Sequence, residues 1–325
     1  MTRHLSSRPR RPAAPWILGA LALGTALSAG VASAGEARSR VILNGVPTPV
    51  VFNDGDSFRV LSGPMSGAKA RLSGFNTLES HGPVHQWGDW TEKELYVIAK
   101  MATYHARDNV WECTTDGKTD GYGRMLVLCP LLAREQIRKG FAHAMTVSDE
   151  PSPPELLEAQ REAMAHRRGI WAHGIPDYVL TSLHSIEEDT EGKPVYNRLV
   201  SSADGHSVKW KHRDKYDECA KVCHRVYTVD EARVDEVVAR LQREQASMLA
   251  GLDPAALRGV VLEFARHHHV TTPVPEAQQE PLQNLLLGWV AQGAFGPPDP
   301  GAPESCMTHV DFKRRYGAAR AQCLR

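Results

Sequence analysis

The sequence predicts an α+β fold that begins with a small five-stranded OB-like barrel, accompanied by further short extended segments and three helices. Short apolar runs separated by turn residues indicate strands at 41–43, 50–52, 58–61, 69–75, 109–113, 125–129 and 141–147. Apolar residues at helical spacing indicate helices at 90–107, 131–139 and 154–168. Short strands interspersed with helices in this way are typical of OB-like barrels.

Turn and cap residues set the boundaries of these elements. The Gly-Pro-Met-Ser-Gly stretch at 63–67 supplies a hairpin turn between two strands. Thr91-x-x-Glu94 can form a capping box at the start of the first helix. Gly140 ends the second helix. The third helix has Pro154 in its first turn and stops at Gly169.

Residues 1–34 have the pattern of a signal peptide. A basic leader precedes an apolar run at 16–27, and Ala32-Ser33-Ala34 has the small-x-small form of a cleavage site. The apolar run is too short to cross a bilayer comfortably. We expect cleavage after Ala34, a secreted or periplasmic protein, and no stable membrane association afterwards. The alternative is an uncleaved membrane anchor.

Six cysteines in an exported chain predict disulfides, although six allow 15 connectivities. Cys113 and Cys129 flank the 120–124 turn on what should be neighbouring strands, so they are the preferred pair. The other four are expected to pair among themselves: Cys219, Cys223, Cys306 and Cys323. A zinc site is the alternative, but Cys-x3-Cys without a second short-spaced pair is a poor zinc signal.

The balance of charge excludes capture of a polyanion by a broad positive field. The formal net charge of the chain is zero. Residues 35–175 carry 16 Lys and Arg against 17 Asp and Glu. Any binding of nucleic acid should therefore depend on local arginines.

Oxygen ligands and an arginine are close together in the predicted hairpin region. Asp56 lies at one side of the hairpin and Asn76 at the other, so their side-chain oxygens can face each other beside Arg71. Oxygen ligands suit calcium, and an arginine fork suits phosphate. A metal and guanidinium groups around a phosphate can hydrolyse a phosphodiester.

Several motifs extend this pattern along the chain. In order, they are Asp54-Gly55-Asp56-Ser57, Arg71, Asn76-Thr77-x-Glu79, Asp120-Gly121-Tyr122-Gly123-Arg124, Gly140-Phe141-Ala142 and Arg168-Gly169-Ile170-Trp171. The ordered series resembles the staphylococcal nuclease (thermonuclease) family over roughly residues 40–175. The resemblance implies an OB-fold nuclease domain at 35–176 and does not extend to 177–325.

The resemblance implies a calcium site. Asp56 and Asn76 would ligate Ca²⁺ by their side chains, and Thr77 would do so by its backbone carbonyl. The family usually has aspartate where this chain has Asn76, so one unit of ligand charge is missing and calcium affinity should fall. Leu78 replaces the proline that usually precedes the glutamate.

The resemblance also implies catalytic residues. Glu79 would hold or activate the attacking water. Arg71 and Arg124 would clamp the phosphate and stabilise charge in the transition state. Tyr122 matches a substrate-binding tyrosine. A lysine that binds a terminal phosphate is replaced by Gly121, and two tyrosines of the nucleotide pocket are replaced at positions 146 and 148 by Thr and Ser.

Residues 177–325 predict a mainly helical, disulfide-containing domain to which no motif assigns a role. Helices are expected at 230–249, 254–268, 280–292 and 308–323, with a strand at 207–212. The histidines at 267–269 follow one another on a helix and point in different directions. We therefore expect a solvated helix end there rather than a metal site.

The sequence thus predicts a secreted, calcium-dependent nuclease that hydrolyses phosphodiester bonds of DNA, RNA or both. One alternative is a catalytically impaired module of the same fold that binds nucleic acid or protein, with Asn76 marking loss of the metal site. Another is that 177–325 is the active part, which binds a partner. The joint presence of Asp56, Arg71, Glu79 and Arg124 favours the enzyme, because a decayed site should also lose arginines.

Overall fold

The computed structural model describes residues 39–271, 273–297, 303–311 and 321–324. These residues belong to one compact unit. The predicted signal peptide and its cleavage site after Ala34 lie outside the described residues. Among the described residues, no helix is both long and apolar enough to cross a membrane.

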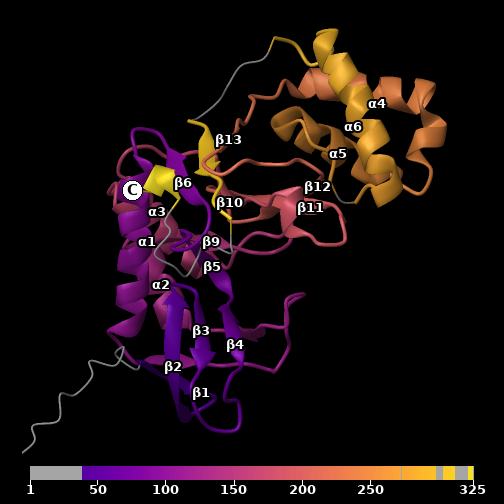
Figure 1. Cartoon of the computed structure of the whole chain (residues 1–325). Coiled ribbons are helices and arrows are strands. Elements are labelled where there is room, and N and C mark those ends of the chain that lie inside the picture. Colours follow the sequence, from indigo (N-terminus) through magenta and orange to yellow (C-terminus); the bar gives the residue numbers. More distant parts are fainter. Residues whose placement is uncertain (1–38, 272, 298–302, 312–320, 325) are drawn as a thin grey trace, which may run out of the picture. The chain divides into compact units, whose positions relative to one another are not determined.

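Six strands form one curled sheet in the order β7-β1-β2-β3-β4-β8 (Figure 1). Their bounds are β1 Ser39–Leu43, β2 Val46–Asp54, β3 Ser57–Val60, β4 Lys69–Leu72, β7 Trp111–Cys113 and β8 Met125–Val127. This sheet has six strands rather than five. The segments predicted at 109–113 and 125–129 are confirmed as β7 and β8, and they form its two edges by pairing in parallel with β1 and β4. The edges meet beyond these strands, where Thr114 and Leu128 exchange two backbone hydrogen bonds of 2.8 Å. This contact curls the sheet towards closure.

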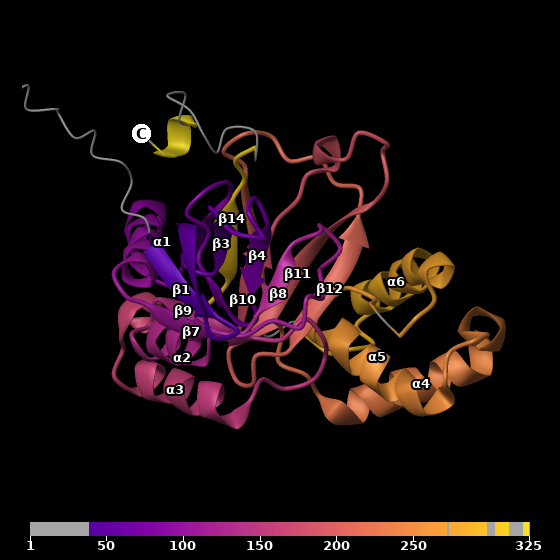
Figure 2. The same cartoon turned by 90° about the horizontal axis from the view of Figure 1, so that it is seen from below.

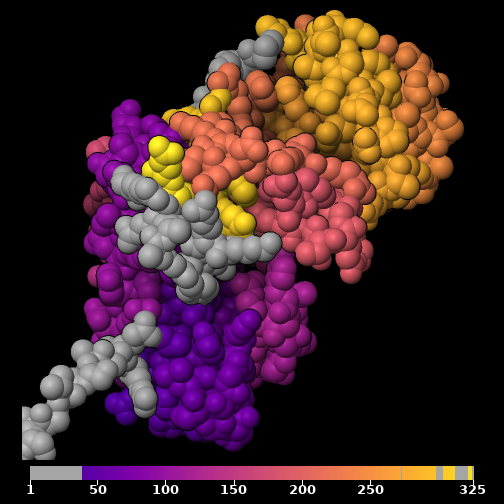
Figure 3. All heavy atoms as spheres, viewed as in Figure 1, coloured from indigo at the N-terminus to yellow at the C-terminus, as the bar shows by residue number. Residues whose placement is uncertain are grey.

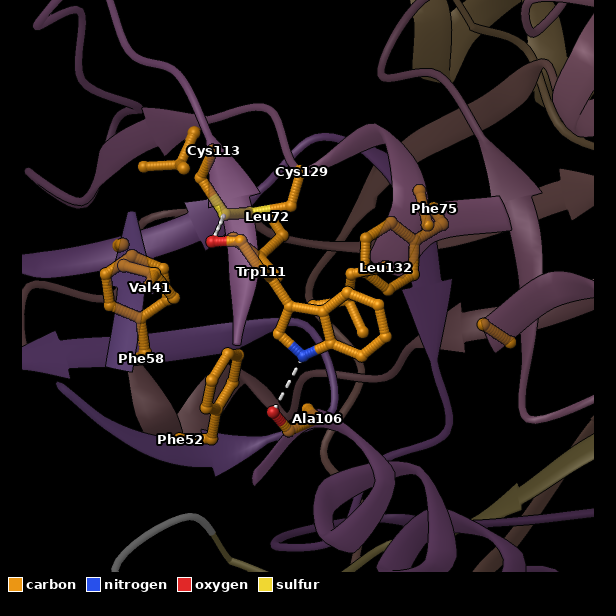
Figure 4. Packing of buried hydrophobic residues seen from close by; sticks show 14 of the residues in the cluster. Val41, Phe52, Phe58, Leu72, Phe75, Ala106, Trp111, Cys113, Cys129 and Leu132 are labelled. Carbon is orange, nitrogen blue, oxygen red and sulfur yellow. Dashed lines mark hydrogen bonds between the residues drawn. A yellow bond between two sulfur atoms is a disulfide. The ribbon is translucent and has the colours of Figure 1, made fainter. Parts of the chain in front are cut away.

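The interior of the curled sheet is apolar and is closed at one end by a disulfide (Figure 4). Phe52 and Phe58 pack edge to face with ring centroids 5.5 Å apart. The indole N–H of Trp111 donates to the carbonyl of Ala106 at 2.9 Å, so this buried ring has its polar atom satisfied. The predicted Cys113–Cys129 disulfide is confirmed and joins the two edge strands.

Three helices lie beside this sheet, and all three were predicted (Figures 1 and 2). They are α1 Glu92–Arg107, α2 Pro130–Arg138 and α3 Pro154–Ala165, the last followed by a 3-10 turn, η1, at Gly169–Trp171. The capping box of Thr91 and Glu94 at the start of α1 is confirmed. Helix α1 packs against β2, and α2 packs against both β7 and α3.

The strand predicted at 69–75 is divided by Gly74. β4 ends at Leu72, and β5 runs from Gly74 to Thr77. Gly74 has φ of 94°, a left-handed conformation that favours glycine. β5 leaves the six-stranded sheet there and pairs antiparallel with β9, Ala142–Met145, which places Asn76 opposite His143.

The prediction of a mainly helical region after residue 177 is only half right. The structure has three strands first, β10 Tyr178–Ser182, β11 Val195–Ser201 and β12 Ser207–His212, which form an antiparallel sheet (Figure 2). β10 and β11 contain runs of buried positions instead of a regular alternation of buried and exposed ones, which hid them in the sequence. The strand predicted at 207–212 is confirmed as β12.

A further sheet joins segments from distant parts of the sequence. β14, Ser305–Thr308, lies between β13, Lys221–His224, and β6, Val84–Trp87. The helix predicted at 308–323 is therefore wrong at its start, because Thr308 ends a strand. Residues 312–320 lie outside the described residues, and a 3-10 turn, η5, follows at Gln322–Leu324.

The helical part consists of α4 Glu231–Glu244, α5 Pro254–His267 and α6 Glu276–Ala291, with a short 3-10 turn, η3, at Ala246–Leu249. Another short 3-10 turn, η2 at Ile186–Glu188, lies between β10 and β11. The helices pack around their own apolar core, and their atoms form one continuous body (Figure 3). The core includes Val237, Leu241, Phe264 and Leu286, all at most 2% exposed. It is separate from the core of the curled sheet.

The histidine run at the end of α5 is not solvated, contrary to the prediction. His267 is only 2% exposed, and its Nδ1 lies 3.1 Å from Nε2 of His224. His269 stacks on Trp210 with ring centroids 4.2 Å apart. The end of α5 is therefore packed against β12 and β13 rather than against water.

All six cysteines form disulfides. The four beyond residue 200 pair among themselves as predicted, Cys219 with Cys323 and Cys223 with Cys306. Three disulfides indicate an extracellular or otherwise oxidising compartment. In the described parts of the chain, the one group of three or more His, Cys, Asp or Glu side chains close enough to share a metal ion is Cys223, Glu304 and Cys306, where both sulfurs are already bonded to each other. The zinc alternative therefore finds no support there.

Candidate active site

Three consecutive strands bring four of the predicted site residues together. Asp56 lies in the turn between β2 and β3, Arg71 lies on β4, and Asn76 and Thr77 lie at the end of β5. Ser57 pairs with Arg71 across β3 and β4. The backbone N–H of Leu72 donates to the carbonyl of Asp56 at 2.8 Å, which fixes the turn against β4.

A hydrogen-bond network joins these four residues. Nη1 of Arg71 donates to Oδ1 of Asp56 at 2.6 Å, and Nη2 donates to Oδ1 of Asn76 at 2.5 Å. The backbone N–H of Thr77 donates to Oδ2 of Asp56 at 2.7 Å. The side-chain amide of Asn76 donates to the carbonyl of Thr77 at 2.8 Å. One guanidinium therefore bridges the two side chains predicted to ligate a cation.

Gly55 allows this close approach. A Cβ atom there would lie 2.5 Å from Cγ2 of Thr77 and 2.9 Å from Cβ of Ala102. Real Cβ atoms do not come so close to other carbon atoms, so any larger residue would push the Asp56 turn away from β5 and α1. The glycine of the Asp-Gly-Asp motif thus has a packing role beside the site.

The site carboxylate is buried. Asp56 is 2% exposed, and burial raises the pKa of its carboxyl to about 7, despite the opposing effect of Arg71. Asp54 contributes a smaller increase, because its own carboxylate lies nearby. Oδ1 of Asp54 accepts hydrogen bonds from the hydroxyl of Ser57 at 2.6 Å and from the N–H of Asp56 at 3.3 Å.

The donor atoms fit a hard divalent cation in type. Asp56, Asn76 and Thr77 offer carboxylate, amide and carbonyl oxygens, which are calcium ligands. The positively charged guanidinium of Arg71 already lies between two of them. The three residues contribute one negative charge, so a divalent cation bound there would be incompletely neutralised. The oxygen atoms of the site are therefore of the type that binds calcium, but their total negative charge is low.

Glu79 and the 120–124 turn lie within electrostatic range of Arg71. Burial lowers the pKa of the Arg71 guanidinium, but Asp56 raises it more strongly together with Asp54, Glu79 and Asp120, and the net shift is upward. Glu79 follows β5 by two residues and is half-buried. The structure therefore places Glu79 near the guanidinium of Arg71, the group that also binds the predicted calcium ligands Asp56 and Asn76.

Arg124 is held inside its own turn. Its Nε and Nη2 each lie 2.7 Å from Oδ2 of Asp120, whose Oδ1 accepts the backbone N–H of Arg124 at 2.9 Å. Gly123 has φ of 72°, which the turn requires. No direct contact joins Arg124 and Arg71 among the described interactions. The carboxylate of Asp120 connects the two arginines electrostatically.

This geometry coincides with a family match. Residues 69–173 match the staphylococcal nuclease homologue family, and we call them the nuclease-homologue segment. The match extends from β4 to just beyond η1 and includes Arg71, Asn76, Glu79 and Arg124. Asp56 precedes the nuclease-homologue segment and reaches it through the β3–β4 pairing. A search of the curated proteins found no match to the chain.

The match gives the segment a nuclease-type fold and indicates nucleic acid as the general kind of partner. Tyr122 lies in the segment and is 64% exposed. Its hydroxyl lies 2.9 Å from that of Tyr196, on β11 outside the segment. Cζ of Arg124 lies 5.4 Å from the ring centroid of Tyr122.

Positions 146 and 148, where the resemblance implies tyrosines, are covered by backbone from beyond the segment. The N–H of Thr146 donates to the carbonyl of Gly205 at 2.8 Å, and the N–H of Ser207 donates to the carbonyl of Ser148 at 2.8 Å. The hydroxyl of Ser207 also donates to the carbonyl of Thr146. The connection between β11 and β12 therefore lies against the place where the nucleotide pocket was expected.

Sequence reasoning missed two groups of residues at this site. Asp54 and Asp120 belong to the quoted motifs, but their roles as acceptors for Ser57 and Arg124 were not predicted. Tyr196 was not predicted at all. The sequence offers one local indication of Tyr196, which is that it lies two residues before Arg198 and so shares one face of a strand with it. Nothing in the sequence indicates which part of the protein that face contacts.

Proposed function

We propose that this chain is an exported, calcium-dependent nuclease that hydrolyses phosphodiester bonds in DNA, RNA or both. The observation that carries the proposal is the network in which Arg71 bridges Asp56 and Asn76 beside Glu79, within a match to the nuclease homologue family. A buried carboxylate, an amide oxygen and an arginine, with a second arginine in the 120–124 turn, have the chemistry needed to hold a phosphate for hydrolysis.

In this proposal the arginines bind the reacting phosphate. Arg71 exchanges its hydrogen bonds to Asp56 and Asn76 for bonds to phosphate oxygens. Arg124 likewise exchanges its hydrogen bonds to Asp120 for bonds to phosphate oxygens. A guanidinium can donate two parallel hydrogen bonds to a phosphate, and these bonds strengthen as negative charge accumulates in the transition state.

Glu79 holds the attacking water and accepts its proton. Its half-buried position after β5, within electrostatic range of Arg71, supports this assignment. Proton acceptance by a positioned carboxylate contributes roughly 10²–10⁴-fold to rate. Tyr122, exposed beside Arg124, binds the nucleotide next to the scissile phosphate.

Asp56, Asn76 and the carbonyl of Thr77 would hold Ca²⁺. When bound, the ion supplies Lewis-acid polarisation of a phosphate oxygen. The oxygen chemistry of these groups supports calcium over zinc or iron. Since the three groups provide a single negative charge, binding is expected in the 10⁻⁴–10⁻³ M range of extracellular modules.

Export is supported by the three disulfides and by the leader pattern of residues 1–34. In the proposed domain organisation, residues 35–176 form the nuclease domain and residues 177–325 a second domain. Pairing of β6 with β14 shows that the two parts share a sheet, so the boundary is not a free linker.

The rival function is a binding module of the same fold without catalysis. It is favoured by one observation: both candidate catalytic arginines are engaged with protein groups, Arg71 with Asp56 and Asn76, and Arg124 with Asp120. The enzyme requires these contacts to exchange for phosphate contacts.

One experiment separates the two functions. The mature, disulfide-bonded chain is incubated with single- and double-stranded DNA and RNA in calcium, in magnesium, or with a chelator. The nuclease gives fragments in calcium and none with chelator. A binding module retards the same nucleic acids on a gel and leaves them intact under every condition.

A further inference from the structure

A group of basic and aromatic side chains on β11 and β12 lies beside the candidate active site. We name Tyr196, Arg198 and Lys209 the β11–β12 patch. Arg198 lies directly opposite Lys209 in the antiparallel register, and Tyr196 is two residues away on the same face of β11. Nζ of Lys209 lies 4.0 Å from the centroid of the Tyr196 ring, and Cζ of Arg198 lies 5.8 Å from it.

Two contacts connect the patch to the nuclease-homologue segment. The hydroxyl of Tyr196 lies 2.9 Å from the hydroxyl of Tyr122. Nη1 of Arg198 donates to the carbonyl of Val147 at 3.5 Å. The positive charge of Arg71 also lowers the pKa of Arg198, in addition to the larger effect of burial. The patch is therefore electrostatically coupled to the centre of the proposed site.

The patch carries positive charge without a carboxylate to balance it. Like charges directly opposite each other on neighbouring strands are destabilising. Burial and the neighbouring cations Arg198 and Lys211 lower the pKa of Lys209. Among the described residues, no carboxylate lies within ion-pair distance of Arg198 or Lys209, whereas Lys211 is paired with Glu276 at 2.7 Å. An anion that binds both groups would relieve this repulsion.

The aromatic rings narrow the class of anion. Tyr122 and Tyr196 meet at their hydroxyls, and each has a cation near its ring. Tyr122 is exposed and Tyr196 is half-buried. Accessible aromatic rings beside arginine and lysine are the elements that bind single-stranded nucleic acid, because rings stack on unpaired bases and cations contact the phosphates. A duplex does not present its base faces to such rings.

We propose that the β11–β12 patch is a binding subsite for single-stranded nucleic acid, which holds the nucleotides next to the phosphate being cleaved. Arg198 and Lys209 contact phosphates, and the Tyr196 ring stacks on a base. Residues of the patch, which lie beyond the nuclease-homologue segment, thus supply substrate contacts that Thr146 and Ser148 cannot make in place of the family's tyrosines. This inference rests on the proposed function, because it assigns the patch to the same substrate.

Binding without hydrolysis tests the patch directly. A labelled single-stranded oligonucleotide is titrated with the full mature chain in the presence of a chelator, and binding is followed by fluorescence anisotropy across a range of salt concentrations. The variant R198Q/K209Q removes both cations. The control R213Q/K215Q removes the same charge from the loop after β12, where Arg213 donates to the carbonyl of Gly192 and Lys215 pairs with Glu187.

The expected result is a loss of affinity of about tenfold or more in R198Q/K209Q, with the slope of log K against log salt reduced by about 1.4, or 0.7 for each lost phosphate contact on a single strand. The control keeps the slope of the parent. Tyr196→Leu is expected to lose about fivefold or more in affinity with little change in slope, since stacking releases no counterions. Tyr196→Phe keeps the ring and should bind nearly as the parent does.

Two results would overturn the inference. One is a salt slope in R198Q/K209Q equal to that of the control. The other is displacement of the oligonucleotide by a polyglutamate peptide of equal charge as effectively as by unlabelled oligonucleotide, which would make the patch a general anion or protein site.

Hydrolysis assays keep this test separate from that of the proposed function. In calcium, R198Q/K209Q should raise KM and leave kcat within about twofold, because the patch binds substrate away from the reacting atoms. A parent that binds through the patch and never cleaves retains the inference and removes the nuclease. A parent that cleaves and binds independently of the patch removes the inference and retains the nuclease.

Discussion

Asn76 accepts a hydrogen bond of 2.5 Å from Arg71 through the oxygen that would otherwise face a cation. Its amide nitrogen donates at the same time to the carbonyl of Thr77. Both atoms of the amide therefore work within the network, and the residue is 4% exposed. An aspartate could accept from Arg71 but could not donate to Thr77. Compared with an aspartate, the amide of Asn76 makes one more internal hydrogen bond but provides no negative charge for a cation.

The first prediction concerns this exchange. Asn76→Asp should lower the calcium concentration needed for half-maximal hydrolysis, because the ligand set gains one negative charge. The saturated rate should change much less, since the arginines and Glu79 are untouched. A calcium titration of activity measures both quantities. Asp56→Ala is the comparison and should abolish calcium dependence and activity together.

Two outcomes of that titration would contradict the proposed site. If the parent protein has no activity at any calcium concentration, while Asn76→Asp is active, the natural site has lost its ability to bind the metal. Activity that persists in the presence of chelator would remove the metal from the mechanism.

The second prediction concerns Arg124. Arg124→Lys should lose roughly two or more orders of magnitude in kcat, because a point charge cannot make the bidentate phosphate contact. Arg138→Lys on α2 is a matched control, since Arg138 pairs with Glu135 on the surface. Thermal unfolding should be similar for both variants. A rate near that of the parent in Arg124→Lys would exclude this arginine from the mechanism.

The third prediction concerns the disulfide that joins the sheet edges. Replacing Cys113 and Cys129 together by alanine should lower the free energy of unfolding by about 3 kcal/mol, the value expected for a loop of this length. Urea denaturation of both proteins, with other disulfides intact, measures the difference. An unchanged unfolding midpoint would mean that the Thr114–Leu128 contact holds the edges together without the disulfide.

The fourth prediction concerns pH. Burial lowers the pKa of His85 from 6.5 to about 3, with a further contribution from His143. Between these pH values the unfolded chain binds a proton at this histidine that the folded chain does not bind. Stability should therefore fall as pH decreases below about 6.5, by up to about 1.4 kcal/mol per pH unit for this group. Well above pH 6.5, His85 is neutral in both the folded and the unfolded chain and does not make the free energy of unfolding depend on pH.

The variant His85→Phe isolates that contribution. Urea unfolding at several pH values should give a flatter dependence of stability on pH below 6.5 than in the parent, by up to one proton. Buried His143 remains and keeps part of the slope. Parallel curves for the two proteins would show that His85 is protonated without cost in the folded chain.

The fifth prediction concerns export. Protein recovered from an oxidising compartment should begin at Gly35 and contain no free thiol, which intact mass before and after alkylation measures. Peptide mapping should find Cys219 joined to Cys323 and Cys223 to Cys306. A mature chain that retains residues 1–34 would support the membrane anchor instead.

Local signals explain what the sequence allowed us to predict. Strands around the 63–67 turn, the capping box at Thr91 and the Cys113–Cys129 pair all depend on residues near one another in the chain. The closeness of Asp56, Arg71 and Asn76 was predictable for the same reason, since the turn before β3, the strand β4 and the strand β5 follow one another in the chain. Their motif spacing reflects that geometry.

Contacts between distant segments explain what was missed. The burial of His267 depends on His224 and Tyr178, which lie in different strands. The strands at the two edges of the curled sheet were predicted, but their parallel pairing with β1 and β4 was not, because it joins segments that are far apart in the chain. Tyr196 reaches the site only because β11 is positioned against the 146–148 segment.

The place of β14 between β13 and β6 has a consequence for the order of events during synthesis. Residues 54–124, which carry the proposed chemistry, emerge from the ribosome well before residues 305–308. Until that later strand arrives, β6 has an unpaired edge only a few residues after Glu79, and pairings between remote segments form slowly. A nascent chain therefore cannot complete the sheet that contains β6 until a strand encoded more than two hundred codons downstream has been synthesised.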